Sequence, residues 1–242
     1  MASLAAAPLY LTYRTYKVYM GRIQDQQRHV AQVSDLHLAT IEALALAIDA
    51  KDQTAQSHIR RVQVYAAGLA RALGMPETEI QGVKTAALLH DIGKLAVPEH
   101  ILSKPGPLTQ EEFQKIRIHP QVGAEIISGV PFPYPVAPLI LSHHERWDGS
   151  GYPRSLAGEE IPLAARILLA CDTFVSMTSP RPWRPARSAD FARAELDRVA
   201  GTQLDPRVVE ALLHTLNPER DSGGASAPDP AAPQPPNAAA SV

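Results

Sequence analysis

Residues 76–94 read PETEIQGVKTAALLHDIGK, and this stretch carries the clearest structural signal in the chain. A proline in the first turn and apolar residues spaced by three and four, ending in Leu88 and Leu89, predict a helix. His90 and Asp91 follow directly at its apolar end. An aspartate is costly to bury unless it is paired or bound to a metal. The stretch therefore predicts both a helix of the core and a pair of candidate metal ligands.

The same helical spacing recurs along the chain, and no window shows the two-residue period typical of strands. Gly74 ends a helix that begins near Thr54, and Thr109 with Glu112 forms a capping box for a helix expected to reach His119. Further helices are expected over residues 35–50, 120–128, 136–144, 162–177, 189–199 and 206–216. The sequence therefore predicts an all-α fold.

Three parts differ in composition. Residues 1–34 are expected to form a connector helix, whose apolar positions need a partner, either its own domain or a second copy in a homodimer. Residues 35–216 hold the predicted helical domain. Residues 217–242 are rich in Pro, Ala, Ser and Gly, and are predicted to be disordered.

Composition excludes several classes of protein. A net charge of −2 and a pI near 6.5 leave no basic surface for a nucleic-acid polymer. The single cysteine, Cys171, cannot form an internal disulfide and is compatible with a reducing cytoplasm. The start of the chain is mildly apolar but is interrupted by Pro8, so we expect neither a signal peptide nor a membrane span. A cytoplasmic location is expected.

Five of the nine histidines fall in four short segments, and a fifth segment ends an apolar run with an aspartate. These segments belong to different predicted helices, so the concentration is hard to explain by packing alone. Imidazoles and carboxylates without a set of thiolates suit Fe, Mn or Zn engaged in hydrolysis or oxygen chemistry. The candidate ligands are His58, His90, Asp91, His119, His143, His144 and Asp172.

The order of these segments resembles the HD-domain metal-dependent phosphohydrolases, specifically their HD-GYP branch. The resemblance covers roughly residues 41–213 and includes His90 to Lys94, the connection Ile101 to Thr109, and His143-His144-Glu145 followed by Gly151-Tyr152-Pro153. Proteins of that branch are all-helical, and many hydrolyse cyclic di-GMP to linear pGpG or to GMP. The resemblance therefore implies a cyclic-dinucleotide phosphodiesterase.

The resemblance also assigns roles to the candidate ligands. Asp91 would bridge two divalent metals, which are expected to be Fe or Mn. Some family members hold a third metal through a glutamate, but that position is Thr54 here, so two metals are expected. One metal would be completed by His58, His90 and Asp172, the other by His119, His143 and His144.

A mechanism follows from charge and geometry. Two nearby divalent ions would lower the pKa of a bridging water, and the resulting hydroxide would be expected to attack the phosphodiester in line. Lys94 lies one helical turn beyond His90, and its ammonium would stabilise charge on a phosphate oxygen. Asp91 and Lys94 are therefore the expected catalytic residues, although a lysine at a helix end is otherwise an ordinary solvated residue.

The substrate contacts are less specific. Gly151, Tyr152 and Pro153 form a turn that would place the Tyr152 ring against a base or a phosphate, or else a rigid loop packed for structure. Arg181 and Arg184 resemble basic positions of the family, and a guanidinium holds phosphate through two hydrogen bonds. Lone arginines on loops are otherwise usually solvated.

Two features leave alternatives open. Glu145 is a candidate to orient a ligand histidine. Val175 stands where family members commonly carry an acid, which removes a hydrogen-bond acceptor expected near the pocket. This departure, with the possible protein contacts of the N-terminal helix, leaves open a signalling module that binds a nucleotide or a protein partner without turnover. Because HD-type sites also process other phosphoesters, an HD phosphohydrolase of another nucleotide phosphoester is a further alternative.

Overall fold

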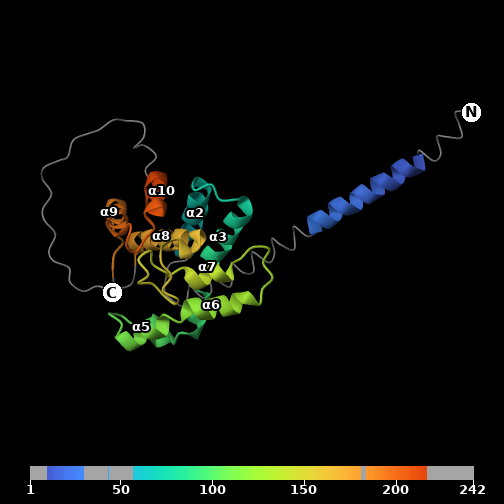
Figure 1. Cartoon of the computed structure of the whole chain (residues 1–242). Helices are drawn as coiled ribbons and strands as arrows, with labels where there is room; N and C mark the ends of the chain where they lie inside the picture. The colour runs from blue at the N-terminus through green and yellow to red at the C-terminus, as the bar shows by residue number, and fades with distance from the viewer. Residues whose placement is uncertain (1–9, 30–42, 44–56, 181–183, 217–242) are drawn as a thin grey trace, which may run out of the picture. The chain divides into compact units, whose positions relative to one another are not determined.

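The computed structural model describes residues 10–29, 43, 57–180 and 184–216 (Figure 1). Within these residues the chain is helical and contains no strand, only two isolated bridges, Asp148 with Ala157 and Ala200 with Leu204. The predicted all-α class is confirmed. Apart from residue 43, the helix expected over residues 35–50 lies outside the described part of the chain, as does the tail of residues 217–242.

Residues 10–29 form one helix, described here by itself because the chain divides into units at Leu44 and Ala45. Tyr10, Tyr13, Tyr16 and Tyr19 recur every third residue and are all exposed. They therefore form a ridge along this N-terminal helix. No helix among the described residues is both long and apolar enough to cross a membrane.

The described residues of the second unit form nine α-helices and two 3₁₀ helices between Ser57 and Leu216. In chain order they are α2 (Ser57–Ala72), α3 (Glu77–Leu89), η1 (Ile92–Ala96), α4 (Glu99–Leu102), α5 (Gln110–Ile116), α6 (His119–Ser128), α7 (Ala137–Ser142), η2 (Gly158–Glu160), α8 (Leu163–Thr178), α9 (Ala189–Val199) and α10 (Pro206–Leu216). The predicted bounds of α9 and α10 are confirmed to the residue.

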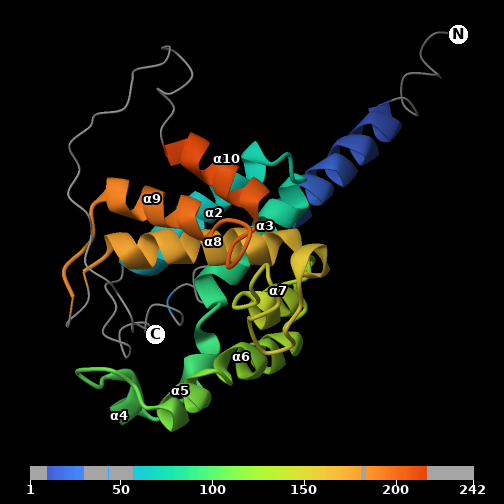
Figure 2. The same cartoon turned by 60° about the vertical axis from the view of Figure 1, so that its left-hand side comes forward.

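The central helix of this unit is α8, which packs against α2, α3, α7, α9 and α10 (Figures 1 and 2). Its apolar residues, including Ile167, Leu168 and Cys171, are buried. Burial, followed by the charge of Asp172, raises the pKa of the Cys171 thiol. Cys171 is therefore a core residue, and Asp172 is carried on a helix that the core holds rigidly.

The α2–α3 turn is set by Gly74, whose φ is +73°. The Gly74 N–H donates to Arg71 and the Met75 N–H donates to Ala70, which closes the end of α2. Because α2 and α3 then pack side by side, His58 at the start of α2 lies near His90 at the end of α3.

The helix that we expected to run from Thr109 to His119 is wrong in its end point. The predicted capping box of Thr109 and Glu112 is present, but α5 ends at Ile116 and α6 begins at His119. Pro120 has no N–H to donate to the Ile116 carbonyl, so the α-helical hydrogen-bond series cannot continue through this point.

Candidate metal centre

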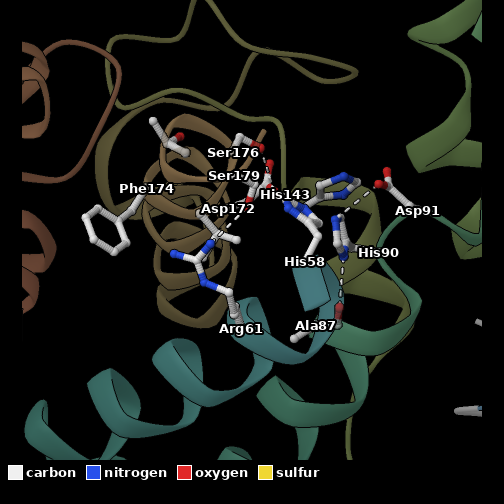
Figure 3. A network of polar contacts seen from close by, with 12 residues as sticks. His58, Arg61, Ala87, His90, Asp91, His143, Asp172, Phe174, Ser176 and Ser179 are labelled. Atoms are coloured by element: carbon white, nitrogen blue, oxygen red, sulfur yellow. Dashed lines mark hydrogen bonds and ion pairs between the residues drawn. The ribbon is translucent and has the colours of Figure 1, made fainter. Parts of the chain in front are cut away.

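The structure brings all seven predicted ligands together, from five helices or helix ends. His58 comes from α2, His90 and Asp91 from the end of α3, and Asp172 from α8, as Figure 3 shows in part. Two groups have ligand atoms within 4.8 Å of one another: His58, His90 and Asp172 in the first, and His119, His143 and His144 in the second. These are the two groups that the resemblance implied.

Asp91 lies between the two groups. Its Oδ2 is 3.3 Å from His90 Nε2 in the first group, and its Oδ1 is 3.4 Å from His119 Nε2 in the second. Each oxygen of one carboxylate therefore faces a different group. This is the arrangement that a carboxylate bridging two cations requires.

Three of the histidines are oriented in the same way. The Nδ1 atom of each lies near the carbonyl oxygen three residues earlier: His90 on Ala87 at 2.9 Å, His119 on Ile116 at 2.7 Å and His143 on Ile140 at 2.5 Å. A carbonyl only accepts, so each Nδ1 carries the hydrogen. In the neutral ring the Nε2 lone pair is then left for a cation.

The helix ends explain this shared orientation. The last carbonyls of a helix have no backbone donor within it, and His90 and His143 follow the last residues of α3 and α7. At His119 the proline after it has the same effect, because Pro120 leaves the Ile116 carbonyl without its N–H partner. Local backbone structure therefore aims these three imidazoles.

The histidines of the second group are neutral at neutral pH, which suits the binding of a cation. Burial lowers the pKa of His119, and burial with the charge of His144 lowers the pKa of His143 well below its ordinary value. Burial also lowers the pKa of His144, to about 3. His119 Nε2 and His143 Nε2 lie 3.3 Å apart. Two facing lone pairs repel unless a proton or a cation lies between them, so this donor set suits a metal ion.

The first group combines an aspartate carboxylate with two imidazoles. His58 Nε2 is 3.0 Å from Asp172 Oδ1, which also accepts from the Ser176 hydroxyl at 3.3 Å. Burial opposes ionisation of Asp172, but its hydrogen bond to His58 and the charges of His58 and His90 together outweigh burial and hold its pKa below the ordinary value. Among the described residues, His58 Nδ1 is buried without a partner.

His90 and Asp91 form a coupled pair. Burial lowers the pKa of His90, but the charge and hydrogen bond of Asp91, together with the charge of Asp172, outweigh it and raise this pKa to about 9. The Asp91 pKa is held well below its ordinary value despite burial, chiefly by the charges of Lys94 and His90. The carboxylate is therefore ionised at neutral pH, as a metal ligand must be.

Two glycines allow the ligand segments to approach. A Cβ at Gly93 would lie 1.9 Å from the His119 carbonyl oxygen, and one at Gly151 would lie 2.3 Å from the Arg146 backbone nitrogen. The first contact holds η1 against α6, so that Asp91 and His119 meet. The second holds residues 151–153 against the segment that carries His144. Both glycines are required by close backbone approach.

Comparison with known proteins agrees with this geometry. A family model described as an HD domain matches residues 42–208. The chain belongs to the HD-domain family. Its relatives place it in the HD-GYP branch, as the sequence predicted.

Two curated relatives of this HD-domain protein are informative. It is 39% identical over 210 residues to the cyclic di-GMP phosphodiesterase response regulator RpfG of Xanthomonas campestris, covering 85% of this chain and 56% of that protein. It is 38% identical over 184 residues to a cyclic di-GMP phosphodiesterase of Thermotoga maritima, covering 75% and 50%. The chain thus spans about half the length of these relatives.

A solved structure shows the same fold. A cyclic GMP-AMP specific phosphodiesterase of Vibrio cholerae, V-cGAP3, superposes with a TM-score of 0.56 at 21% identity, over 74% of this chain and 49% of that one. The two chains therefore share the same helical fold over this part.

Tyr152 of the HD-domain protein lies against His144, a candidate metal ligand. Its ring stacks on His144, with 4.8 Å between ring centroids and 25° between planes, and its N–H donates to the His144 carbonyl at 3.2 Å. Phe113 meets the same ring edge-on. The aromatic ring expected beside the candidate metal centre is thus present, and it also packs against the candidate ligand His144.

Glu145 has a different role from the one expected. Its side chain is buried, and its two carboxylate oxygens accept from the backbone N–H groups of Arg154 and Leu156 at 2.7 and 3.0 Å. It therefore fixes the loop that follows Tyr152, and no contact of its carboxylate with a ligand histidine occurs among the described residues.

The remaining predicted residues differ in their positions. The Lys94 ammonium donates to Asp91 Oδ2 at 2.9 Å, so it lies beside the carboxylate that faces both histidine groups. The Arg184 guanidinium donates to the Ser176 carbonyl at 2.8 Å, at the end of α8. Arg181 lies outside the described residues. Val175 is fully buried in the packed side of α8, so its side chain does not line an open pocket.

Two residues near the centre were missed by sequence reasoning. Arg117, at the end of α5, holds its guanidinium over the Tyr152 ring, 4.7 Å from the centroid. Arg61, one turn after His58, donates to Thr178 Oγ1 at 2.6 Å and Ser179 Oγ at 2.9 Å, as Figure 3 shows. The only sequence signal for Arg117 was its place two positions before His119. Its contact, Tyr152, belongs to a loop that is distant in the sequence.

Proposed function

We propose that this chain is a metal-dependent phosphodiesterase that cleaves a phosphodiester bond of a cyclic dinucleotide. The observation that carries the proposal is the position of Asp91, whose two oxygens face the two histidine groups at 3.3 and 3.4 Å. A paired site of this kind suits in-line displacement at phosphorus, because both the attacking and the leaving oxygen can be stabilised.

The proposed cofactor is a pair of divalent ions, Fe or Mn. His58, His90 and Asp172 would hold one, His119, His143 and His144 the other, and Asp91 would join them. The donors are nitrogen and oxygen without thiolate, which suits these metals. When bound, the ions would lower the pKa of a water and neutralise the phosphodiester.

The chain's own residues would then position the two metal-binding groups and hold the substrate. The Asp91 carboxylate, kept ionised by Lys94 and His90, fixes the spacing of the two groups. The Lys94 ammonium lies beside that carboxylate, where it would donate to a non-bridging oxygen of the scissile phosphate. Tyr152 would contact the nucleotide beside His144, and Gly151 and Pro153 would shape its turn. Arg181 and Arg184 would also contact a phosphate of the substrate.

Cyclic di-GMP is the first proposed substrate, since the two curated relatives are named as its phosphodiesterases. The proposed products are linear pGpG, GMP or both. Cyclic GMP-AMP contains the same kind of bond, and the crystallised relative is named for it. Both compounds therefore belong in the first test.

The test is anaerobic incubation of Mn- or Fe-loaded protein with each cyclic dinucleotide, with products resolved by chromatography and metal content measured in the same samples. Asp91→Ala is the inactive control. We expect a linear product from the wild-type protein and none from the control. Metal-loaded protein that binds cyclic di-GMP without product would point to a signalling module, and hydrolysis of other phosphoesters alone would change the substrate class.

We also propose that residues 10–29 pair with a second copy of the chain. The supporting feature is the ridge of four exposed tyrosines on this helix. Sedimentation velocity of the full chain and of a Tyr13→Ser, Tyr16→Ser variant tests it. A dimer in the first that becomes a monomer in the second is the expected result, and equal sedimentation would exclude this interface.

A further inference from the structure

The guanidinium of Arg117 has an unusual environment. It lies 4.7 Å from the centroid of the Tyr152 ring, and its side chain is half-buried at the end of α5. Within the described residues it makes no hydrogen bond or ion pair. Five N–H donors in a planar fork are therefore held in place by a ring contact alone.

The Tyr152 ring that holds the Arg117 guanidinium lies beside the candidate metal centre. Tyr152 stacks on His144, which belongs to the second ligand group. Arg117 is also two residues before His119, a ligand of the same group. A guanidinium held near a site for divalent cations is repelled by them unless an anion lies nearby to offset the charge.

The short helix α5 supports this interpretation. It has no buried residue, and its capping box and the 2.6 Å ion pair of Glu112 with Lys104 fix its start. At its other end, Phe113 and Arg117, one turn apart, both contact Tyr152. The end of α5 therefore presents a cation and an aromatic edge beside the metal centre.

We infer that Arg117 binds the phosphate of the cyclic dinucleotide that is not being cleaved, with Tyr152 as the platform for its guanidinium. The inference rests on the proposed function. Lys94 is placed at Asp91, near the scissile phosphate, whereas Arg117 reaches the metal group only through Tyr152. A guanidinium that stacks on a ring keeps its N–H edge available for two hydrogen bonds to phosphate. Arg117 would thus select a substrate with two phosphates.

The test compares Arg117→Ala with Lys115→Ala. Lys115 is exposed on the same helix, so its variant removes an equal charge two residues away. With cyclic di-GMP, we expect Arg117→Ala to raise KM roughly tenfold to a hundredfold, the range for one charge-assisted hydrogen-bonded contact, with little change in kcat. Lys115→Ala should match the wild type.

Two further measurements separate contact from support. Bis(p-nitrophenyl) phosphate has a single phosphate, so its hydrolysis should be unchanged in Arg117→Ala. Titration calorimetry with a phosphorothioate cyclic di-GMP should show the same loss of affinity at unchanged metal content. Arg117→Lys keeps the charge without the fork, and should recover only part of it.

Each other outcome overturns the inference in a recognisable way. An equal KM in Arg117→Ala and the wild type would exclude a contact between Arg117 and the second phosphate. Equal losses on both substrates, with less bound metal, would make Arg117 a support for Tyr152 and His144. No turnover of any cyclic dinucleotide by metal-loaded wild-type protein would remove the proposed function itself, and this inference with it.

Discussion

The imidazole of His144 and the phenol ring of Tyr152 are stacked, 4.8 Å apart between centroids and 25° between planes. The Tyr152 N–H also donates to the His144 carbonyl. Residues 151–153 and the second ligand group therefore form one structural unit. A change at Tyr152 should affect the metal site as well as the nucleotide.

Tyr152→Ala should weaken metal binding at the second group by about tenfold, because groups that orient a ligand side chain typically contribute that much or more. Tyr152→Phe keeps the stacked ring and should bind metal like the wild type. Titration of the metal-free proteins against a competing chelator measures both. Unchanged affinity in the alanine variant would show that the backbone alone positions His144.

Gly151→Ala should unfold at lower temperature than the wild type. Its Cβ would lie 2.3 Å from the Arg146 nitrogen and 2.5 Å from Glu145 Cα, which are backbone atoms that move only together with the loop. We expect a loss of about 1–3 kcal/mol or more in the free energy of unfolding. Thermal and denaturant unfolding would measure it.

Gly68→Ala is the matched control. Gly68 lies inside α2, and a Cβ there meets nothing within 4 Å. Alanine is the better helix former by about 0.5–1 kcal/mol, so this variant should be as stable as the wild type or more so. Equal behaviour of the two variants would contradict the close approach at Gly151.

Local signals account for most of the fold that sequence predicted. Helix ends marked by glycine or a capping residue, as at Gly74 and Thr109, were found near their true positions. The error at the end of α5 arose because apolar spacing continues through Ile116 and Ile118. The break depends on a single backbone N–H that Pro120 lacks. The short helix α4 and the 3₁₀ segments η1 and η2 are too brief to show a period.

The candidate ligands could be found in the sequence because their residue types are rare in apolar surroundings. His90-Asp91 and Asp172 follow apolar runs, where an unpaired polar group is costly. Arg117 and Glu145 were beyond such reasoning, because their roles depend on contacts with a distant loop. Glu145 accepts from Arg154 and Leu156, and nothing in its local sequence distinguishes these donors from a ligand histidine.

Metal uptake should release a proton and strengthen with pH. The folded-state pKa of His90 is about 9, above the ordinary 6.5. Burial lowers this pKa, and the neighbouring Asp91 carboxylate raises it. Protonated His90 therefore stabilises the metal-free protein fully below pH 6.5, and this contribution is lost as pH rises through about 9. A metal needs the unprotonated Nε2, so it must displace this proton.

From pH 7 to 9, we expect the apparent affinity of the first group to rise about tenfold per pH unit, with about one proton released per metal bound. His144 adds no proton in this range, because burial lowers its pKa to about 3. Calorimetry in buffers of different ionisation enthalpy measures the protons. An affinity independent of pH between 7 and 9 would contradict the raised pKa of His90.

Val175→Asp should destabilise the protein and leave turnover unimproved. Val175 is fully buried on α8, three residues after Asp172, so an aspartate there would place a second carboxylate in an apolar setting. The nearby guanidinium of Arg61 is engaged with Thr178 and Ser179, one turn further along α8. We expect a loss of about 1–3 kcal/mol in the free energy of unfolding, the cost of an unsatisfied buried polar group.

Val175→Thr, which is close in shape, separates loss of packing from the effect of the charge. It should lose less stability than Val175→Asp, because its hydroxyl can donate to a helix carbonyl one turn earlier. Unfolding midpoints and kcat/KM for cyclic di-GMP would be measured in parallel. A rise in kcat/KM at unchanged stability would instead mean that Arg61 turns from Thr178 to the new carboxylate, and that the acid common in the family serves substrate recognition through this pair.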